Sequence, residues 1–362
     1  MTSDSQMQTP SVPGILSADE VQLTAESIAV LQLSDGMIQW YPDGHADPWN
    51  HIESAMALAT CGLISEAERA YQWLADIQRP DGSWHNYYTA AGIEDSKLDS
   101  NCVAYIAAGV WHHWLVTQDR AFLERFWDVV EPAIEFVLDL QSKRGEIIWA
   151  RHPDGKPWSY ALLTGSSSIS HSLRCASWIA DEIGKERPHW VDARDRLVNV
   201  IANHPNAFEP KARWAMDWYY PVLTGAVVGD DALKLLNRAW DTFVMPGKGV
   251  RCVSDRPWIT AAETCECVIA HLAVGERAAA LSMFTWAQAL RHRDGSYFTG
   301  MVFPELVHFP DKERSSYTAA AIVLAADALE GSNPTATLFT DHASFTDHTS
   351  VTDHISARGR GH

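Results

Sequence analysis

The sequence predicts an all-α protein, an (α/α)6 barrel in which six helical hairpins close into a ring. A glycine turn followed by a helix of small residues recurs along the chain. The turns at Gly36 and Gly82 are 46 residues apart, and so are those at Gly249 and Gly295. Periods of this length are typical of repeat architectures. Neither end carries the polar capping repeat that an open helical solenoid needs, so we favour a closed ring over the solenoid.

Each repeat is predicted to contain a charged outer helix, a glycine turn, a short extended piece with aromatic residues, and an inner helix. The first outer helix should begin at the capping box formed by Ser17 and Glu20 and run to about Leu33. The inner helices are expected at residues 50–61, 99–114, 167–179, 217–228, 261–273 and 315–329. Their many Ala, Ser, Cys and Gly residues suit close packing inside a ring.

Residues 15–330 are predicted to form this barrel, after a flexible leader at residues 1–14. Residues 331–362 have few large apolar side chains and repeat Thr-Asp-His every six residues. Such a low-complexity segment cannot offset its ordering entropy by burial. We therefore expect a disordered tail that can be removed after Gly331 without loss of the fold.

Composition limits the partners and the compartment. The net charge of −18, from 28 basic and 46 acidic residues, argues against a nucleic-acid partner, which requires a basic face. No apolar run reaches the length of a membrane span, and the N-terminus lacks the features of a signal peptide. The six cysteines form neither a disulfide framework nor a CxxC pair. We expect a cytoplasmic protein without a metal, whose oligomeric state the sequence does not define.

Two loops that enter inner helices carry the candidate catalytic residues, Asp47 and Glu263. Pro48-Trp49 and Pro257-Trp258 both precede a helix with an embedded glutamate. In an (α/α)6 barrel, the loops that lead into the inner helices line one funnel. Two carboxyl groups with flat aromatic side chains in a cleft are typical of glycoside hydrolysis, in which one carboxylic acid protonates the leaving oxygen and one carboxylate activates water or attacks the sugar.

The other candidates are aromatic and polar residues of the same loops, which would bind the sugar. The expected substrate-binding residues are Trp40, His45, Trp49, Glu53, Trp84, Tyr88, Asp99, Asn101, Asp217, Tyr219 and Trp258. Glycoside hydrolysis needs no cofactor, and the sequence contains no dinucleotide fingerprint, phosphate-binding loop, HExxH or GxSxG motif. We therefore expect no cofactor.

Both catalytic candidates also have a structural interpretation. Asp47 stands before Pro48, where an N-cap residue belongs. Thr260 and Glu263 have the spacing of a capping box, in which Glu263 only fastens the start of its helix.

The segment from Gln78 to Trp84 resembles the Q-x-x-x-G-x-W repeat of the squalene cyclase and prenyltransferase toroids. That repeat is a surface staple and has no catalytic role. The D-x-D-D and D-D-x-x-D motifs and the zinc-binding Asp-x-Cys are absent from the chain. The likeness therefore implies the toroid architecture, and it leaves a terpenoid cyclase or prenyl transfer protein as an alternative.

Residues 44–50 and 261–265 resemble the mycobacterial methylmannose polysaccharide hydrolases, and the resemblance extends over most of residues 15–330. It implies an (α/α)6 endo-α-mannosidase that cleaves α-1,4-linked, partly 3-O-methylated mannose chains inside the cell, with the acidic pair on Asp47 and Glu263. We expect inversion, with Glu263 as the acid and Asp47 as the base. A carbohydrate-binding toroid without catalysis is the non-enzymatic alternative.

Overall fold

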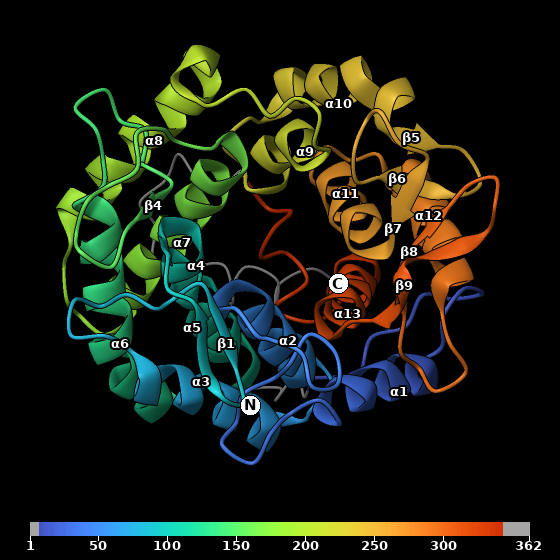
Figure 1. Ribbon diagram of the computed structural model, residues 1–362, viewed down its shortest axis with the longest axis horizontal. Coiled ribbons are helices and arrows are strands. Elements are labelled where there is room, and N and C mark those ends of the chain that lie inside the picture. Colours follow the sequence, from blue (N-terminus) through green and yellow to red (C-terminus); the bar gives the residue numbers. More distant parts are fainter. Residues whose placement is uncertain (1–6, 343–362) are drawn as a thin grey trace, which may run out of the picture.

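The computed structural model describes residues 7–342 and is built mainly from helices arranged in two concentric rings (Figure 1). The inner helices are α2 (Pro48–Thr60), α4 (Ser100–Ala104) with α5 (Ile106–Thr117), α7 (Leu163–Glu182), α9 (Met216–Leu223), α11 (Ala261–Ala273) and α13 (Ser316–Glu330). The outer helices are α1 (Ala18–Ala29), α3 (Ile64–Ile77), α6 (Arg120–Leu138), α8 (Pro188–Asn203), α10 (Gly229–Phe243) and α12 (Arg277–Ala287).

The inner ring is closed. Each inner helix packs against the next one along the chain, and α13 packs against α2. Each outer helix lies against inner helices of its own or the neighbouring hairpin, as Figure 1 shows. The predicted (α/α)6 barrel is therefore confirmed. Within residues 7–342, no helix is both long and apolar enough to cross a membrane.

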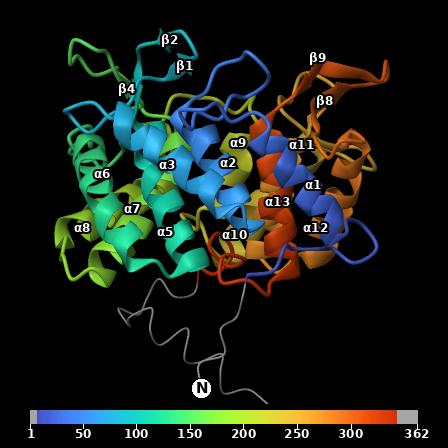
Figure 2. The same ribbon diagram turned by 90° about the horizontal axis from the view of Figure 1, so that it is seen from below.

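Short strands gather at one end of the barrel (Figure 2). Two of the sheets are pairs, β1 (Tyr87–Thr89) with β2 (Gly92–Asp95), and β3 (Leu98–Asp99) with β4 (Ala150–Arg151). The third is an antiparallel sheet in sequence order, β5 (Val244–Met245), β6 (Gly249–Arg251), β7 (Trp258–Thr260), β8 (Phe298–Val302) and β9 (Val307–Arg314). The sequence predicted extended pieces here but not this five-stranded sheet.

Most helix boundaries agree with the prediction. The capping box of α1 forms, since Ser17 Oγ accepts from the backbone N–H of Glu20 and the Glu20 carboxylate accepts from that of Ser17. The helix expected at residues 261–273 has those bounds. The helix expected at residues 99–114 is instead divided at Tyr105 into α4 and α5.

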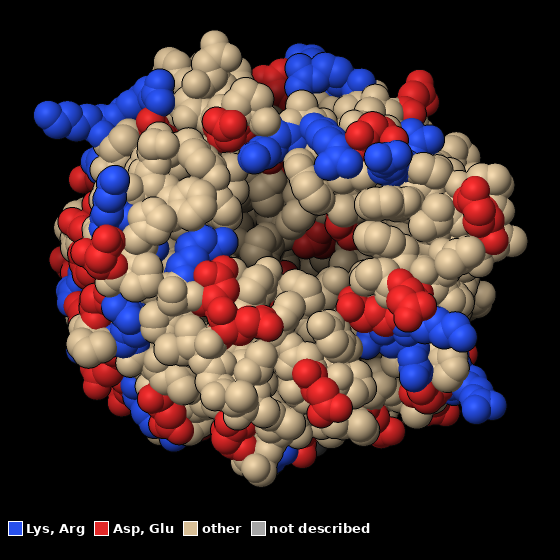
Figure 3. All heavy atoms as spheres, in the orientation of Figure 1, with Lys and Arg blue, Asp and Glu red and all other residues tan. Residues whose placement is uncertain are grey.

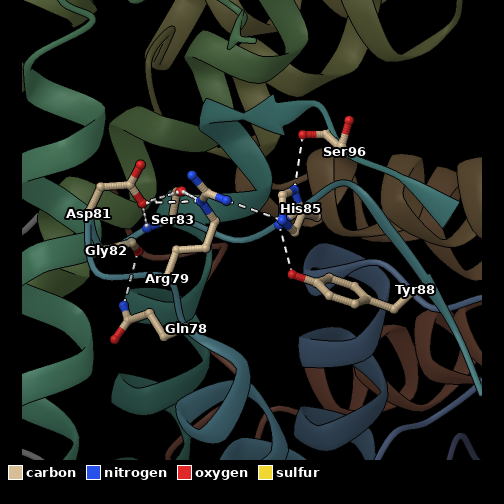
Figure 4. Close-up of polar contacts among 8 residues, drawn as sticks. All are labelled: Gln78, Arg79, Asp81, Gly82, Ser83, His85, Tyr88 and Ser96. Atoms are coloured by element: carbon tan, nitrogen blue, oxygen red, sulfur yellow. Dashed lines mark hydrogen bonds and ion pairs between the residues drawn. The ribbon is translucent and has the colours of Figure 1, made fainter. Parts of the chain in front are cut away.

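A glutamine at three of the glycine turns fastens the turn to the next outer helix, and we call this contact the glutamine staple. Gln78 Nε2 donates to the carbonyl oxygen of Gly82 at 3.0 Å (Figure 4). It also donates to the carbonyl oxygen of Val129 in α6 at 2.9 Å. The glycine is required, because its φ is +84° and an added Cβ would lie 2.2 Å from the carbonyl oxygen of Pro132. Gln32 and Gln141 make the same two bonds.

The structure differs from the predicted flexible leader over residues 7–14. Val12 is buried and pairs with Leu16 in a short backbone bridge. Gln8 exchanges two hydrogen bonds with the side chain of Asn333. This segment therefore packs against the far end of the chain. Residues 1–6 lie outside the described residues.

The structure also differs from the predicted tail over residues 332–342, which cross the base of the ring. The Asp327 carboxylate accepts from Asn333 Nδ2 and Thr335 Oγ1, each at 2.6 Å. The carbonyl oxygen of Leu338 lies 3.0 Å from His171 Nε2, and the Phe339 ring stacks on the His171 ring. We call residues 332–342 the basal segment. Residues 343–362 lie outside the described residues.

We predict that a chain ending at Gly331 is less stable than one ending at His342, which keeps every contact of the basal segment. The truncation removes the buried Leu338 side chain and both donors to the buried Asp327 carboxylate. The loss of these interactions should lower the free energy of unfolding by at least about 2 kcal/mol. Urea denaturation of the two chains measures it, and equal midpoints and slopes would contradict the packing described here.

Candidate active site

A pocket of about 340 Å³ opens at the centre of the end that carries the strands. Figure 3 shows this hollow, with acidic side chains inside it. Its lining includes five carboxyl groups, from Asp47, Glu53, Asp99, Glu263 and Glu266. We call it the acidic pocket. Its aromatic walls come from Trp40, Trp49, Tyr87, Trp149 and Tyr317.

Asp47 is the N-cap residue of α2 and also lines the pocket. Its Oδ1 accepts from the backbone N–H of Asn50 at 3.1 Å, while its Oδ2 accepts from Trp40 Nε1 at 2.7 Å and from Asn50 Nδ2 at 2.8 Å. Burial raises the pKa of Asp47, and the bonds from Asn50 and Trp40 oppose that rise. The capping role predicted for Asp47 is thus confirmed, and it coexists with a place in the pocket.

Glu263 lines the acidic pocket from α11, on a different side of the ring from Asp47. The capping box predicted from Thr260 does not form, because the Thr260 side chain makes no cap hydrogen bond within residues 7–342. The side chain of Glu263 is partly buried, and it is not held in a capping box at the start of α11.

Glu53 forms part of the floor of the acidic pocket. Its Oε1 accepts from Trp49 Nε1 at 2.8 Å and from the Tyr105 hydroxyl at 3.1 Å. Burial raises the pKa of Glu53 to about 7, against the lowering effect of these two donors, and the Asp47 charge adds to the rise.

Glu266 forms the rest of the floor. The sequence places it among the carboxylates of the funnel but predicts no catalytic or binding role for it. Its Oε1 accepts from the Tyr220 hydroxyl at 2.6 Å, and its Oε2 accepts from the Tyr219 hydroxyl. Burial raises the pKa of Glu266 well above its usual range, and the nearby Glu53 charge raises it further. The two floor glutamates therefore disfavour each other's ionisation, so that the neutral form of each is stabilised.

A second tryptophan–aspartate pair stands beside the first. Trp149 Nε1 donates to Asp99 Oδ2 at 2.5 Å, and Lys97 lies over the Trp149 ring at 4.2 Å. Neither Trp149 nor Lys97 is among the residues predicted to bind substrate. Trp149 follows the turn glycine by four residues, as Trp40 does in the first repeat, and that correspondence is the signal that identifies it.

A second pocket of about 310 Å³, which we call the side pocket, adjoins the acidic pocket. The two share Trp49, Asp99, Trp149 and Met216 as walls and are therefore adjacent, and we call them together the cleft. Two further candidates line the side pocket, namely Asn101 and Asp217.

Trp84 and Tyr88 were expected to bind substrate, but the structure places both in the interior. Trp84 is 1% exposed, and its Nε1 donates to the carbonyl oxygen of Leu74 at 2.8 Å. The Tyr88 hydroxyl accepts from the backbone N–H of His85 (Figure 4), and the ring packs against Trp73. Both residues are buried within the fold, and neither lines the acidic pocket or the side pocket.

Three other candidates lie behind the cleft walls. The Tyr219 hydroxyl is used by Glu266. The Trp258 ring stacks on Phe309 in the five-stranded sheet, with centroids 4.4 Å apart. The His45 ring lies against Trp40 and Tyr87 and 2.9 Å from Glu94. None of the three lines the acidic pocket or the side pocket.

Comparison with known proteins gives one relative over almost the whole chain. The chain is 49% identical over 330 residues, 91% of each chain, to MMP endo-(1,4)-3-O-methyl-α-D-mannosidase from Mycolicibacterium hassiacum. An uncharacterised glycosyl hydrolase from Methanocaldococcus jannaschii is 29% identical over 84 residues, which is 23% of this chain and 14% of that protein. No protein-family model matches the chain.

Solved structures share the fold at low sequence identity. A glycosidase in complex with glucose superposes with a TM-score of 0.70 at 13% identity, over 87% of this chain and 97% of that one. Cellobiose 2-epimerase from Spirochaeta thermophila superposes with a TM-score of 0.62 at 13% identity, over 85% and 95%. At such identities the likeness establishes the architecture alone.

We predict that Glu53 makes the stability of the protein depend on pH. Its folded pKa of about 7 exceeds the ordinary value of 4.5, so its contribution favours folding below pH 4.5 and is lost as pH rises through about 7. Glu53→Gln keeps an acceptor oxygen for Trp49 and Tyr105 without the charge. Melting temperatures should therefore fall less between pH 6 and pH 8 in this variant than in the parent protein.

The exposed Glu305→Gln is the matched control for this measurement, and it should keep the parental pH dependence. The assignment to Glu53 fails if both variants retain the same fall in melting temperature.

Proposed function

Because the chain belongs to the endo-(1,4)-3-O-methyl-α-D-mannosidase family of glycoside hydrolases, we propose that it hydrolyses internal α-1,4 linkages of a 3-O-methylmannose polysaccharide. The observation that carries this proposal is the pair Asp47 and Glu263, which face one pocket from different helices of the ring. Aromatic walls beside them offer the flat apolar faces on which sugar rings stack.

Glu263 acts as the general acid and Asp47 as the general base. The N–H donors to Asp47 favour its carboxylate form, in which it can take a proton from a water molecule. Glu263 protonates the glycosidic oxygen as the bond to the anomeric carbon breaks. The water oxygen forms the new bond to that carbon, and Asp47 holds the proton taken from the water. Glu263 then takes up a proton from solvent and Asp47 releases one, which restores the starting state.

The positions of these residues in the ring favour inversion. Asp47 caps α2 and Glu263 lies in α11, and α13 stands between these helices and contacts both (Figure 1). Helices in contact are about 8–10 Å apart. Inverting enzymes separate their carboxyl groups by about 6.5–9.5 Å, to admit a water molecule, whereas retaining enzymes need about 5–5.5 Å.

The cleft also supports endo action, because the side pocket adjoins the acidic pocket and provides room for a neighbouring sugar. A cyclase or prenyl transfer role has no comparable support, since the acidic motifs of those toroids are absent. The carboxyl groups of the cleft likewise give no support to a role restricted to binding.

We place the enzyme in the cytoplasm. All six cysteines are free thiols, and five of them are buried. Proteins of oxidising compartments commonly use cysteines in disulfides, so free thiols suit a reducing compartment. Fractionation of cells that express the native chain tests this assignment.

We predict that Asp47→Asn and Glu263→Gln each lower turnover of a 3-O-methylated α-1,4-mannooligosaccharide by at least about 100-fold, the usual contribution of an acid or base group. Product sizes by mass spectrometry measure cleavage, and melting temperatures verify the fold. Asp154→Asn, in an exposed loop, is the control. If either active-site variant keeps near-normal turnover, the substituted residue has a structural role and not a catalytic one.

We also predict that the first product formed from the α-linked substrate has the β configuration at its new reducing end. Proton NMR during the first minutes of reaction distinguishes the anomers before they equilibrate. An α-anomer appearing first means retention and rules out the separation of acid and base described above.

A further inference from the structure

We infer that the side pocket binds a methyl ether of the substrate and selects 3-O-methylated mannose over unmethylated mannose. This inference rests on the proposed function and names the part of the cleft that sets its specificity. The side pocket lies next to the acidic pocket and shares the Trp49 and Trp149 walls with it, so a sugar beside the scissile bond reaches it.

The surface of the side pocket is mainly apolar. Leu162, Trp214 and Met216 complete the walls that the two shared tryptophans begin. The charged residues of its lining are Lys211 and the carboxylates of Asp99 and Asp217, and both carboxylates accept hydrogen bonds from the protein. Asp217 Oδ1 accepts from the Thr164 hydroxyl at 2.7 Å and from its backbone N–H at 3.3 Å.

An apolar pocket distinguishes a methyl ether from a hydroxyl through the cost of desolvation. A hydroxyl placed against the apolar wall of Leu162, Trp214 and Met216 gives up hydrogen bonds to water and finds no partner on that wall, which is unfavourable. A methyl ether has no proton to donate, and its methyl group gains from leaving water. The pocket therefore favours the methylated sugar for two reasons. The methyl group is stabilised by leaving water, and the hydroxyl of an unmethylated sugar is destabilised by losing its hydrogen bonds.

One polar group inside the pocket is without a partner. Asn101 is 3% exposed, and its Oδ1 has no hydrogen-bond partner within residues 7–342. Ligand sites commonly combine apolar walls with a few polar groups that fix orientation. We assign the Asn101 amide to a free hydroxyl next to the methyl ether, so that only one position of the ring meets the apolar wall.

Gly165 provides the space for the methyl group. It lies in α7, where glycine is unfavourable, and its backbone is not in the left-handed region that would require glycine. A Cβ added there would meet Asn101 Cβ at 3.6 Å and Leu162 Cβ at 3.9 Å, which are ordinary contacts. The absence of a side chain at Gly165 is thus explained by the pocket, not by the fold.

Gly165→Ala tests the inference, because it places a methyl group of the protein where the methyl ether is expected. The substrates are two α-1,4-mannooligosaccharides of equal length, one 3-O-methylated and one not. We expect kcat/KM for the methylated substrate to fall by about tenfold or more, the usual effect of one carbon in an apolar pocket. The value for the unmethylated substrate should change by less than about twofold, and the melting temperature should not fall.

Ser166→Ala is the matched control, because Ser166 is the next residue of α7, is buried, and does not line the pocket. It should leave both kcat/KM values unchanged. Equal losses on both substrates in Gly165→Ala, or no loss on either, would overturn the inference.

A binding measurement separates this inference from the proposed function. If the parent protein cleaves neither substrate, the proposed function fails. Isothermal calorimetry of both oligosaccharides with the parent protein and Gly165→Ala then decides the pocket by itself. Preferential binding of the methylated sugar, lost in the variant, supports the methyl-ether site, and equal binding of the two sugars contradicts it.

Discussion

The glutamine staple is the constraint that fixes three of the hairpins at one height in the ring. One side-chain amide nitrogen carries two protons, so it satisfies a carbonyl of its own turn and a carbonyl of the next outer helix at once. At the sixth turn Arg291 occupies the glutamine position and pairs with Glu20 of α1 at 3.3 Å, while Gly295 approaches the Leu23 carbonyl oxygen. An ion pair therefore takes the place of the staple where the last repeat meets the first.

Sequence alone predicted the features that local signals encode. Capping residues, glycine turns and small-residue helices gave the ring, and Asp47 and Glu263 were found because each stands at the start of an inner helix. The aromatic candidates were predicted less well. Their position after the turn glycine nevertheless distinguishes the buried residues from those that line the pocket. The second residue after the turn glycine is buried in Ile38, Trp84, Ile147 and Tyr297. The fourth lines the acidic pocket in Trp40, Asn86 and Trp149. Alternation along an extended segment separates the two sets.

Other features depend on contacts between distant parts of the chain. The tyrosines that donate to Glu266 come from α9, and no spacing in the sequence places them beside α11. The basal segment has a polar composition, so Leu338 and Phe339 do not stand out from it. The basal segment packs against residues such as His171, which lie at the base of the ring only after the ring has formed. Composition predicts the average behaviour of a segment and not the fate of two apolar residues within it.

The ring is a blind funnel, because the floor glutamates and the Phe339 of the basal segment together line one small inner cavity below the pocket. A polymer cannot thread through it from one face to the other. It must lie across the open mouth and be cut where it dips toward the acids, and both fragments must then leave from the side by which the polymer arrived. Such an enzyme needs no free chain end to begin, and it has no track along which to slide to the next bond.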